Sequence, residues 1–139
     1  MGEQDPIDLA ARALQHRDRS RREVEERLAR AGIGEERRND ALETLERVGY
    51  VDDERFAGAR AGALANRGYG DEWIQHDLAE HGVAAEAVAE AIAALTPEAE
   101  RAAALVERLG SSLKTGAQLA RKGFSQDALE AALGIDVGN

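Results

Sequence analysis

The chain has 139 residues, a length typical of one domain or of a short array of small units. Hydrophobic residues make up 43% of the chain, but 28 residues are alanine, so the core is expected to be thin. Lysine and arginine total 18 against 27 aspartates and glutamates, and the resulting net charge of −9 argues against nonspecific duplex binding through a uniformly basic surface.

The chain contains no cysteine, which excludes disulfides, thiolate metal sites and thiol nucleophiles. Residues 1–15 carry acids where a secretion signal would carry positive charge. No apolar run approaches the roughly 18 residues that a membrane span needs. These features predict a cytoplasmic protein that contacts no membrane.

Helix-forming residues dominate the sequence and no stretch alternates apolar with polar residues, so we predict an all-α fold. Asp5-Pro6 places a capping carboxylate before a proline at the first helical position, and Thr96-Pro97 repeats this start signal. The S-x-x-E sequence that begins at Ser20 predicts a capping box. The predicted helices cover residues 6–17, 21–31, 35–48, 53–67, 71–81, 85–95, 97–109, 113–122 and 126–133.

Three glycines, Gly32, Gly82 and Gly123, each follow a helical pattern as a left-handed C-terminal cap would, and aligning the chain on them exposes an internal repeat. Six further columns match in all three copies. They are Leu14, Leu64 and Leu105; Arg17, Arg67 and Arg108; Ser20, Gly70 and Ser111; Leu28, Leu78 and Leu119; Ile33, Val83 and Phe124; and Leu42, Ile92 and Leu133.

A repeat of roughly 40 residues is typical of stacked helical units that share a continuous core. We divide the chain into three-helix repeats at 1–48, 49–95 and 96–139, which together form one continuous structural unit. The first two glycines are nine residues further apart than the last two, and we assign the extra length to one connection, around residues 46–54. The predicted architecture is an elongated, curved array of three tandem repeats.

Three consecutive acids, Asp52, Asp53 and Glu54, allow two interpretations. They could form a metal or acid-base site, or they could cap a helix, where carboxylates satisfy free amides and oppose the positive end of the helix dipole. We favour capping. No catalytic constellation is found, no metal site or cofactor is predicted, and His76 and His81 are spaced so that they do not share a helix face.

The candidate partner-binding residues are cationic. Arg17, Arg67 and Arg108 recur near helix C-termini, where structure alone can explain a cation, although repeat symmetry would also line them along one side of the array. Three more arginines cluster at a helix N-terminus, where the dipole disfavours cations, and there we find no local structural benefit. The full candidate set is Arg17, Arg19, Arg21, Arg22, Arg67, Arg108, Arg121 and Lys122.

Trp73 lies one residue before Ile74 on its predicted helix and therefore about 100° away from the buried stripe. That position leaves two alternatives, a contact between repeats or an exposed anchor for a partner. We favour the contact between repeats, because tryptophan is usually mostly buried.

Several segments of the sequence together resemble the RecX family. They are Arg17-Asp18-Arg19-Ser20 with Val24, Leu28 and Gly32; the stretch GYVDDERFA at 49–57; the stretch RGYG at 67–70 with Ile74, Leu78 and Gly82-Val83; and the stretch LARKGFS at 119–125. The resemblance covers about residues 5–134.

The resemblance implies a bacterial regulator of the RecA recombinase that takes part in DNA repair and the SOS response. Similar proteins lie in the helical groove of the RecA filament on single-stranded DNA and suppress its ATPase, strand-exchange and co-protease activities. Because this chain is acidic, we expect protein contacts with the RecA filament and weak direct DNA binding. We also expect a monomeric protein. Two alternatives stay open: a helical-repeat adaptor for another protein, and a nucleic-acid binder acting through the arginine-rich first repeat.

Overall fold

The computed structural model describes residues 4–134, which form α-helices and no strand. In chain order the helices are α1 (Pro6–His16), α2 (Arg21–Arg30), α3 (Glu35–Arg47), α4 (Asp53–Asn66), α5 (Asp71–Glu80), α6 (Ala85–Ala93), α7 (Glu98–Leu109), α8 (Leu113–Arg121) and α9 (Gln126–Leu133). The all-α prediction and the order of the helices are confirmed, and most helices end one or two residues earlier than predicted.

Local capping chemistry accounts for most of these boundaries. The Asp5 carboxylate accepts from the amide of Ile7 at 2.9 Å, and Ser20 forms both halves of the predicted capping box of α2. One start differs from the prediction, because Pro97 precedes α7 as its cap residue rather than starting the helix. Helix α8 starts at residue 113 as predicted, with Ser112 as its cap.

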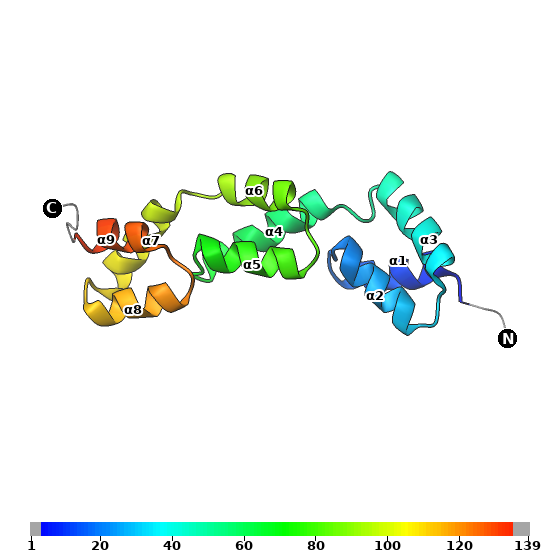
Figure 1. Ribbon diagram of the computed structural model, residues 1–139, viewed down its shortest axis with the longest axis horizontal. Coiled ribbons are helices and arrows are strands. Elements are labelled where there is room, and N and C mark those ends of the chain that lie inside the picture. The colour runs from blue at the N-terminus through cyan, green and yellow to red at the C-terminus, as the bar shows by residue number, and fades with distance from the viewer. Residues whose placement is uncertain (1–3, 135–139) are drawn as a thin grey trace.

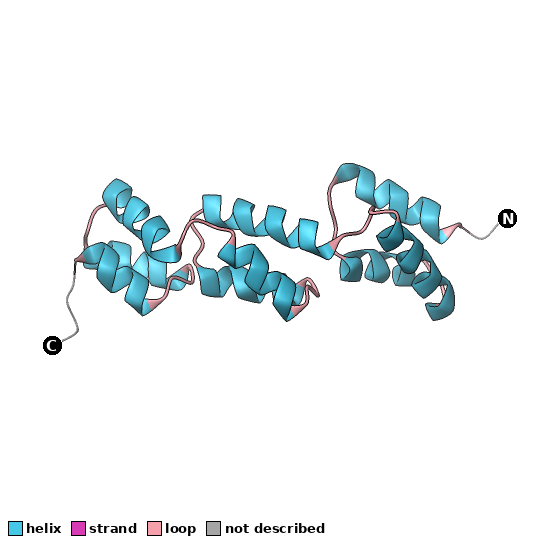
Figure 2. Cartoon of the chain, turned by 90° about the horizontal axis from the view of Figure 1, so that it is seen from above, coloured by secondary structure: helices cyan, strands magenta, loops and turns pink. Residues whose placement is uncertain are grey.

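The helices pack in three groups of three, which follow one another along the long axis of an elongated molecule (Figure 1). We call α1–α3 the first unit, α4–α6 the middle unit and α7–α9 the last unit. From above, only short loops lead from one unit to the next (Figure 2). The exact repeat boundaries at 48/49 and 95/96 stay a prediction.

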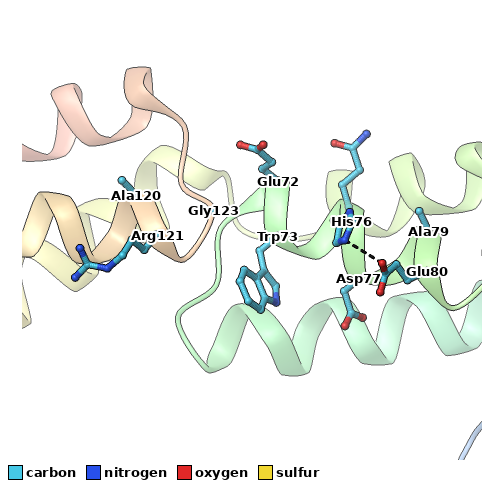
Figure 3. A pocket seen from close by; sticks show the side chains of 10 residues that line it. Glu72, Trp73, His76, Asp77, Ala79, Glu80, Ala120, Arg121 and Gly123 are labelled. Carbon is cyan, nitrogen blue, oxygen red and sulfur yellow. Dashed lines mark ion pairs between the residues drawn. The ribbon is translucent and has the colours of Figure 1, made fainter.

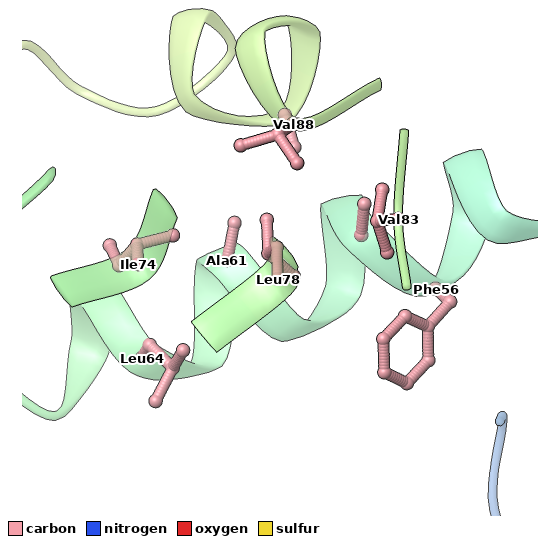
Figure 4. Close-up of a cluster of buried hydrophobic side chains, with 9 residues drawn as sticks. Phe56, Ala61, Leu64, Ile74, Leu78, Val83 and Val88 are labelled. Atoms are coloured by element: carbon pink, nitrogen blue, oxygen red, sulfur yellow. The ribbon is translucent and has the colours of Figure 1, made fainter. Parts of the chain in front are cut away.

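Each unit buries its own hydrophobic core, so the expectation of one continuous core is wrong. In the middle unit Ile74 and Leu78 of α5 pack against α4, which presents Phe56 and Leu64, and Val88 closes the cluster from α6 (Figure 4). Fully buried alanines on α4 let the helices approach closely, which is how a sequence rich in alanine fills a core.

The extra length between the first two glycines is shared among helices and is not confined to one connection. Helix α3 has 13 residues against nine in α6, and α4 has 14 against 12 in α7. The added length is about one turn in α3 and less in α4, which keeps the packed face of each helix while moving its end. The prediction of a single longer connection is therefore wrong, although the repeat is preserved.

The second helices of the units, α2, α5 and α8, lie end to end along one side of the molecule (Figure 1). The C-terminal end of α8 meets the N-terminal end of α5, and the C-terminal end of α5 meets the N-terminal end of α2. Gly82 and Gly123 stand at these meeting points, whereas Gly32, at the outer end of α2, has nothing within 4 Å of an added Cβ. Within residues 4–134, no helix is long and apolar enough to span a membrane.

Candidate partner-binding site

The first junction, between the first and middle units, is built by the arginines at the start of α2. The Arg21 amide donates to Asp53 Oδ1 at 2.8 Å, and the Arg21 guanidinium donates to Glu46 at 2.7 Å. The Arg22 guanidinium donates to the Glu80 carbonyl at 3.4 Å and lies against Gly82. The prediction that these arginines have no structural benefit is therefore wrong.

Arg19 also has partners within its own unit. Its Nε donates to the Ala13 carbonyl at 3.1 Å, and its guanidinium lies 3.8 Å from Glu23, which Arg17 also contacts at 2.7 Å. Burial lowers the pKa of Arg19. Burial opposes ionisation of Glu23, but the Ser20 amide and Arg17 outweigh it and lower the pKa of Glu23. Arg17 and Arg19 are thus engaged by the first unit itself.

Two ion pairs that the sequence analysis missed reinforce the first junction and the middle unit. Arg55, inside the GYVDDERFA stretch, binds Asp18 of the first unit through two hydrogen bonds of 2.9 and 3.0 Å and also donates to the Gly49 carbonyl at 2.9 Å. Arg60 binds Asp77 of α5 at 2.6 and 2.9 Å. This hydrogen-bonded guanidinium lowers the pKa of Asp77 despite the burial of that carboxyl.

The three acids at positions 52–54 act largely as caps. Asp52 is the cap residue of α4 and accepts from the Arg55 amide at 3.0 Å, which confirms the capping interpretation. Asp53 accepts the Arg21 amide across the first junction, and its pKa is raised by burial. No cluster of potential metal ligands occurs among the described residues.

The second junction, between the middle and last units, repeats this acid-to-amide contact and adds main-chain bonds. Glu98, at the start of α7, accepts from the Asp71 amide at 2.7 Å, as Asp53 does from Arg21. The amide of Gly70 donates to the Lys122 carbonyl at 2.8 Å, and the Glu72 amide donates to the Gly123 carbonyl at 3.2 Å. The N-terminal amides of α5 are therefore satisfied by the next unit.

A stack of aromatic and cationic groups covers the second junction. The rings of Tyr69 and Trp73 stack with centroids 4.7 Å apart, and Lys122 Nζ lies 4.6 Å from the Tyr69 centroid. Lys122 also donates to the Arg67 carbonyl at 2.9 Å. The predicted contact between repeats is confirmed for Trp73, because its backbone and Cβ press on Gly123. The residue also stays 44% exposed, and a role as an anchor for a partner stays a prediction.

An open groove of about 670 Å³ runs along α5 beside this stack (Figure 3). Its wall on α5 includes Glu72, Trp73 and Glu80, and α8 contributes Arg121. His76 lies 3.2 Å from Glu80 on the exposed surface of α5.

The structure thus places the predicted cationic residues in separate groups. Arg67, Arg121 and Lys122 gather at the second junction. Arg21 and Arg22 stand at the first junction, and Arg17 and Arg19 share Glu23. Arg108 is exposed in the last turn of α7, away from these groups. Their binding roles stay a prediction.

An elongated helical array with open grooves defines a repeat protein of the kind that presents extended surfaces to another macromolecule. The comparisons with known proteins make this class more specific. A family model described as "RecX, second three-helix domain" matches residues 52–92, which span α4–α6 of this chain.

Curated relatives match over almost the whole chain. The "Regulatory protein RecX" of Xanthomonas citri is 33% identical over 97% of this chain and 90% of its own length. That of Stenotrophomonas maltophilia (strain R551-3) is 33% identical over 96% of this chain and 88% of its own length. The chain belongs to the RecX family, so the resemblance noted from the sequence is confirmed.

Solved structures support the fold. The crystal structure of RecX from Lactobacillus salivarius superposes with a TM-score of 0.81 at 21% identity and covers 93% of this chain and 92% of its own. A second crystal structure, of regulatory protein RecX, gives a TM-score of 0.75 at 22% identity over 91% of this chain and 71% of its own.

Proposed function

We propose that this protein binds the RecA filament on single-stranded DNA and inhibits its ATPase, recombinase and co-protease activities. Family membership over nearly the full chain carries the proposal. The long array of three units, with grooves on its surface, suits a partner that repeats along an axis. In this proposal the protein is a cytoplasmic monomer that acts by binding and catalyses no reaction.

The cations of the last two units are the best candidates for the filament contact. Arg67, Arg108 and Arg121 are exposed, and neither Arg108 nor Arg121 is held by an ion pair among the described residues. The guanidinium of Arg22, by contrast, already bridges the first and middle units, and that of Arg21 is paired with Glu46 inside the first unit. Reversing their charge would break these structural contacts, so loss of activity in such variants would not identify a binding surface.

The test is the rate of ATP hydrolysis by RecA on single-stranded DNA as the protein is added, with binding to the DNA alone as the control. We expect inhibition below one molecule per RecA protomer, together with weak DNA binding. Unchanged hydrolysis with a cognate RecA would overturn the proposal and favour an adaptor for another protein. Tight, steeply salt-dependent binding to bare DNA would favour the nucleic-acid alternative.

Matched variants locate the contact. Reversing charge at Arg108 and Arg121 should weaken inhibition about tenfold. The same reversal at Arg30 and Arg47, which also end exposed helices, should have a smaller effect. Equal loss in both pairs would show that overall charge, not this surface, governs the interaction.

A further inference from the structure

The exposed ring of Trp73 is held rigidly at the second junction. Its backbone and Cβ are 2.6 Å from the position that a Cβ on Gly123 would occupy, so the two segments are in close contact. Its ring stacks on Tyr69 at 4.7 Å with an interplanar angle of 23°. A large apolar surface that is fixed before binding loses little conformational entropy when a partner covers it.

The side of the groove formed by α5 is negatively charged. Glu72 and Glu80 line it with Trp73, and among the described residues neither carboxylate is paired with a lysine or arginine. The nearby arginines of the middle unit point elsewhere, because Arg55 is bound by Asp18 and Arg60 by Asp77. The middle unit therefore does not neutralise this surface.

Helix geometry places the Trp73 ring and Glu80 within reach of one extended ligand segment. Trp73 and Glu80 are seven residues apart on α5 and so lie on the same face, two turns apart. Figure 3 shows the Trp73 ring and the Arg121 side chain at the neighbouring ends of α5 and α8. Arg121 supplies positive charge at one end of a groove whose α5 wall is acidic.

We propose that this groove binds a cationic segment of a protein partner. One arginine or lysine of that segment lies over the exposed face of Trp73, where the ring attracts a cation, and a second pairs with Glu72 or Glu80. Arg121 then faces an acceptor, such as a carboxylate, of the same segment. A nucleic acid fits less well, because its phosphates would meet the two carboxylates. The inference deepens the proposed function by assigning a surface to the filament contact.

A charge-reversal pair tests the surface in the ATPase assay. Glu72→Lys with Glu80→Lys should raise the protein concentration needed for half-inhibition at least tenfold. Glu86→Lys with Glu90→Lys is the matched control, because both residues are exposed on α6 of the same unit, outside the groove, and the change in charge is identical. Equal inhibition by the two double variants would overturn the proposal.

The ring itself provides a second readout, since Trp73 is the only tryptophan of the chain. A tryptophan-free oligoarginine peptide should change the emission of Trp73, and the change should be lost in the Glu72→Lys, Glu80→Lys variant and kept in the α6 control. A response to single-stranded DNA with none to the peptide would overturn the proposal in favour of a nucleic-acid site. A peptide response without any inhibition of RecA would reject the proposed function and retain the groove.

Discussion

The two junctions of the array join similar units by different chemistry. Among the described residues, every hydrogen bond across the first junction involves a side chain: Arg55 pairs with Asp18, the Asp53 carboxylate accepts from the Arg21 amide, and the Arg22 guanidinium donates to the Glu80 carbonyl. The second junction also contains an ion pair, Arg101 with Asp71 at 2.7 Å, and a part-buried acid-to-amide contact, but it adds two main-chain hydrogen bonds and a close backbone approach. Exposed ion pairs are screened by salt and each contributes little to stability, whereas closely packed backbone segments cannot shift without losing their contacts. We therefore expect a salt-sensitive first junction and a rigid second one.

The largest loss of stability should come from adding a methyl group at Gly70. A Cβ there would lie 2.4 Å from backbone atoms of Gly123 and Phe124, which cannot swing away as a side chain can. Gly70→Ala should lower the free energy of unfolding by about 3 kcal/mol, the upper end for an overpacked site. Urea unfolding followed by Trp73 fluorescence measures it.

Gly34 offers the matched control for that substitution. It also precedes a helix with extended backbone, but nothing lies within 4 Å of an added Cβ. Gly34→Ala should lower the free energy of unfolding by less than about 1 kcal/mol, because only the preference for a cap residue changes. Equal losses at Gly34 and Gly70 would contradict the rigid second junction.

The repeated glycines provide a graded comparison of the same kind. Gly32, Gly82 and Gly123 share a φ of 84–94°, so alanine at each pays a similar backbone penalty of roughly 1–2 kcal/mol. An added Cβ meets nothing at Gly32, the flexible Arg22 side chain at Gly82, and the backbone of Trp73 at Gly123. The loss of stability should therefore rise in that order, to about 2–3 kcal/mol at Gly123. Thermal unfolding of the three variants checks the ranking, and a different order would show that the junctions are not packed as described.

These contacts mark the boundary between what the sequence predicts and what it does not. Helix positions follow from signals within a few residues, such as Ser20 with Glu23 or Asp52 before α4, and these were predicted. The junctions depend on partners far apart in sequence: Asp53 is 32 residues from Arg21, and Asp18 is 37 from Arg55. No local periodicity encodes such pairs.

The candidate site shows the same limit. The sequence singled out cationic residues, but it could not separate Arg22, whose guanidinium joins two units, from Arg121, which lines an open groove. The repeat gave one usable signal, because all three recurring glycines have positive φ and two of them, Gly82 and Gly123, stand where another helix end approaches closely. Trp73 could be placed one residue away from the buried stripe, but its contact with Gly123 spans 50 residues of chain.

The first junction should be weaker and respond to salt. Arg55→Gln removes the two hydrogen bonds to Asp18 and should lower the free energy of unfolding by about 1 kcal/mol in low salt and by less at 0.5 M NaCl. Arg47→Gln, on the exposed end of α3, is the control and should change little. A loss at Arg55 that did not depend on salt would mean that packing, not charge, dominates the first junction.

The smallest expected change in stability depends on pH. The pKa of Asp77 is lowered chiefly by its hydrogen bonds from Arg60, so the ionised carboxylate stabilises the fold above the unfolded pKa of about 4, and this stabilisation is lost as pH falls through the folded pKa. The pH dependence of Asp53 has the opposite sign. Burial raises its pKa, so its contribution to stability is present at low pH and is lost as pH rises through the folded pKa.

Because ionised Asp77 stabilises the fold, Asp77→Asn should lower the free energy of unfolding at pH 7 by less than about 1 kcal/mol, and the difference from the unmodified protein should shrink towards pH 3. Thermal unfolding from pH 3 to 7 measures this, with Asp127→Asn on exposed α9 as control. A loss of stability in Asp77→Asn that stayed constant from pH 3 to 7 would contradict the role assigned to the Arg60–Asp77 pair.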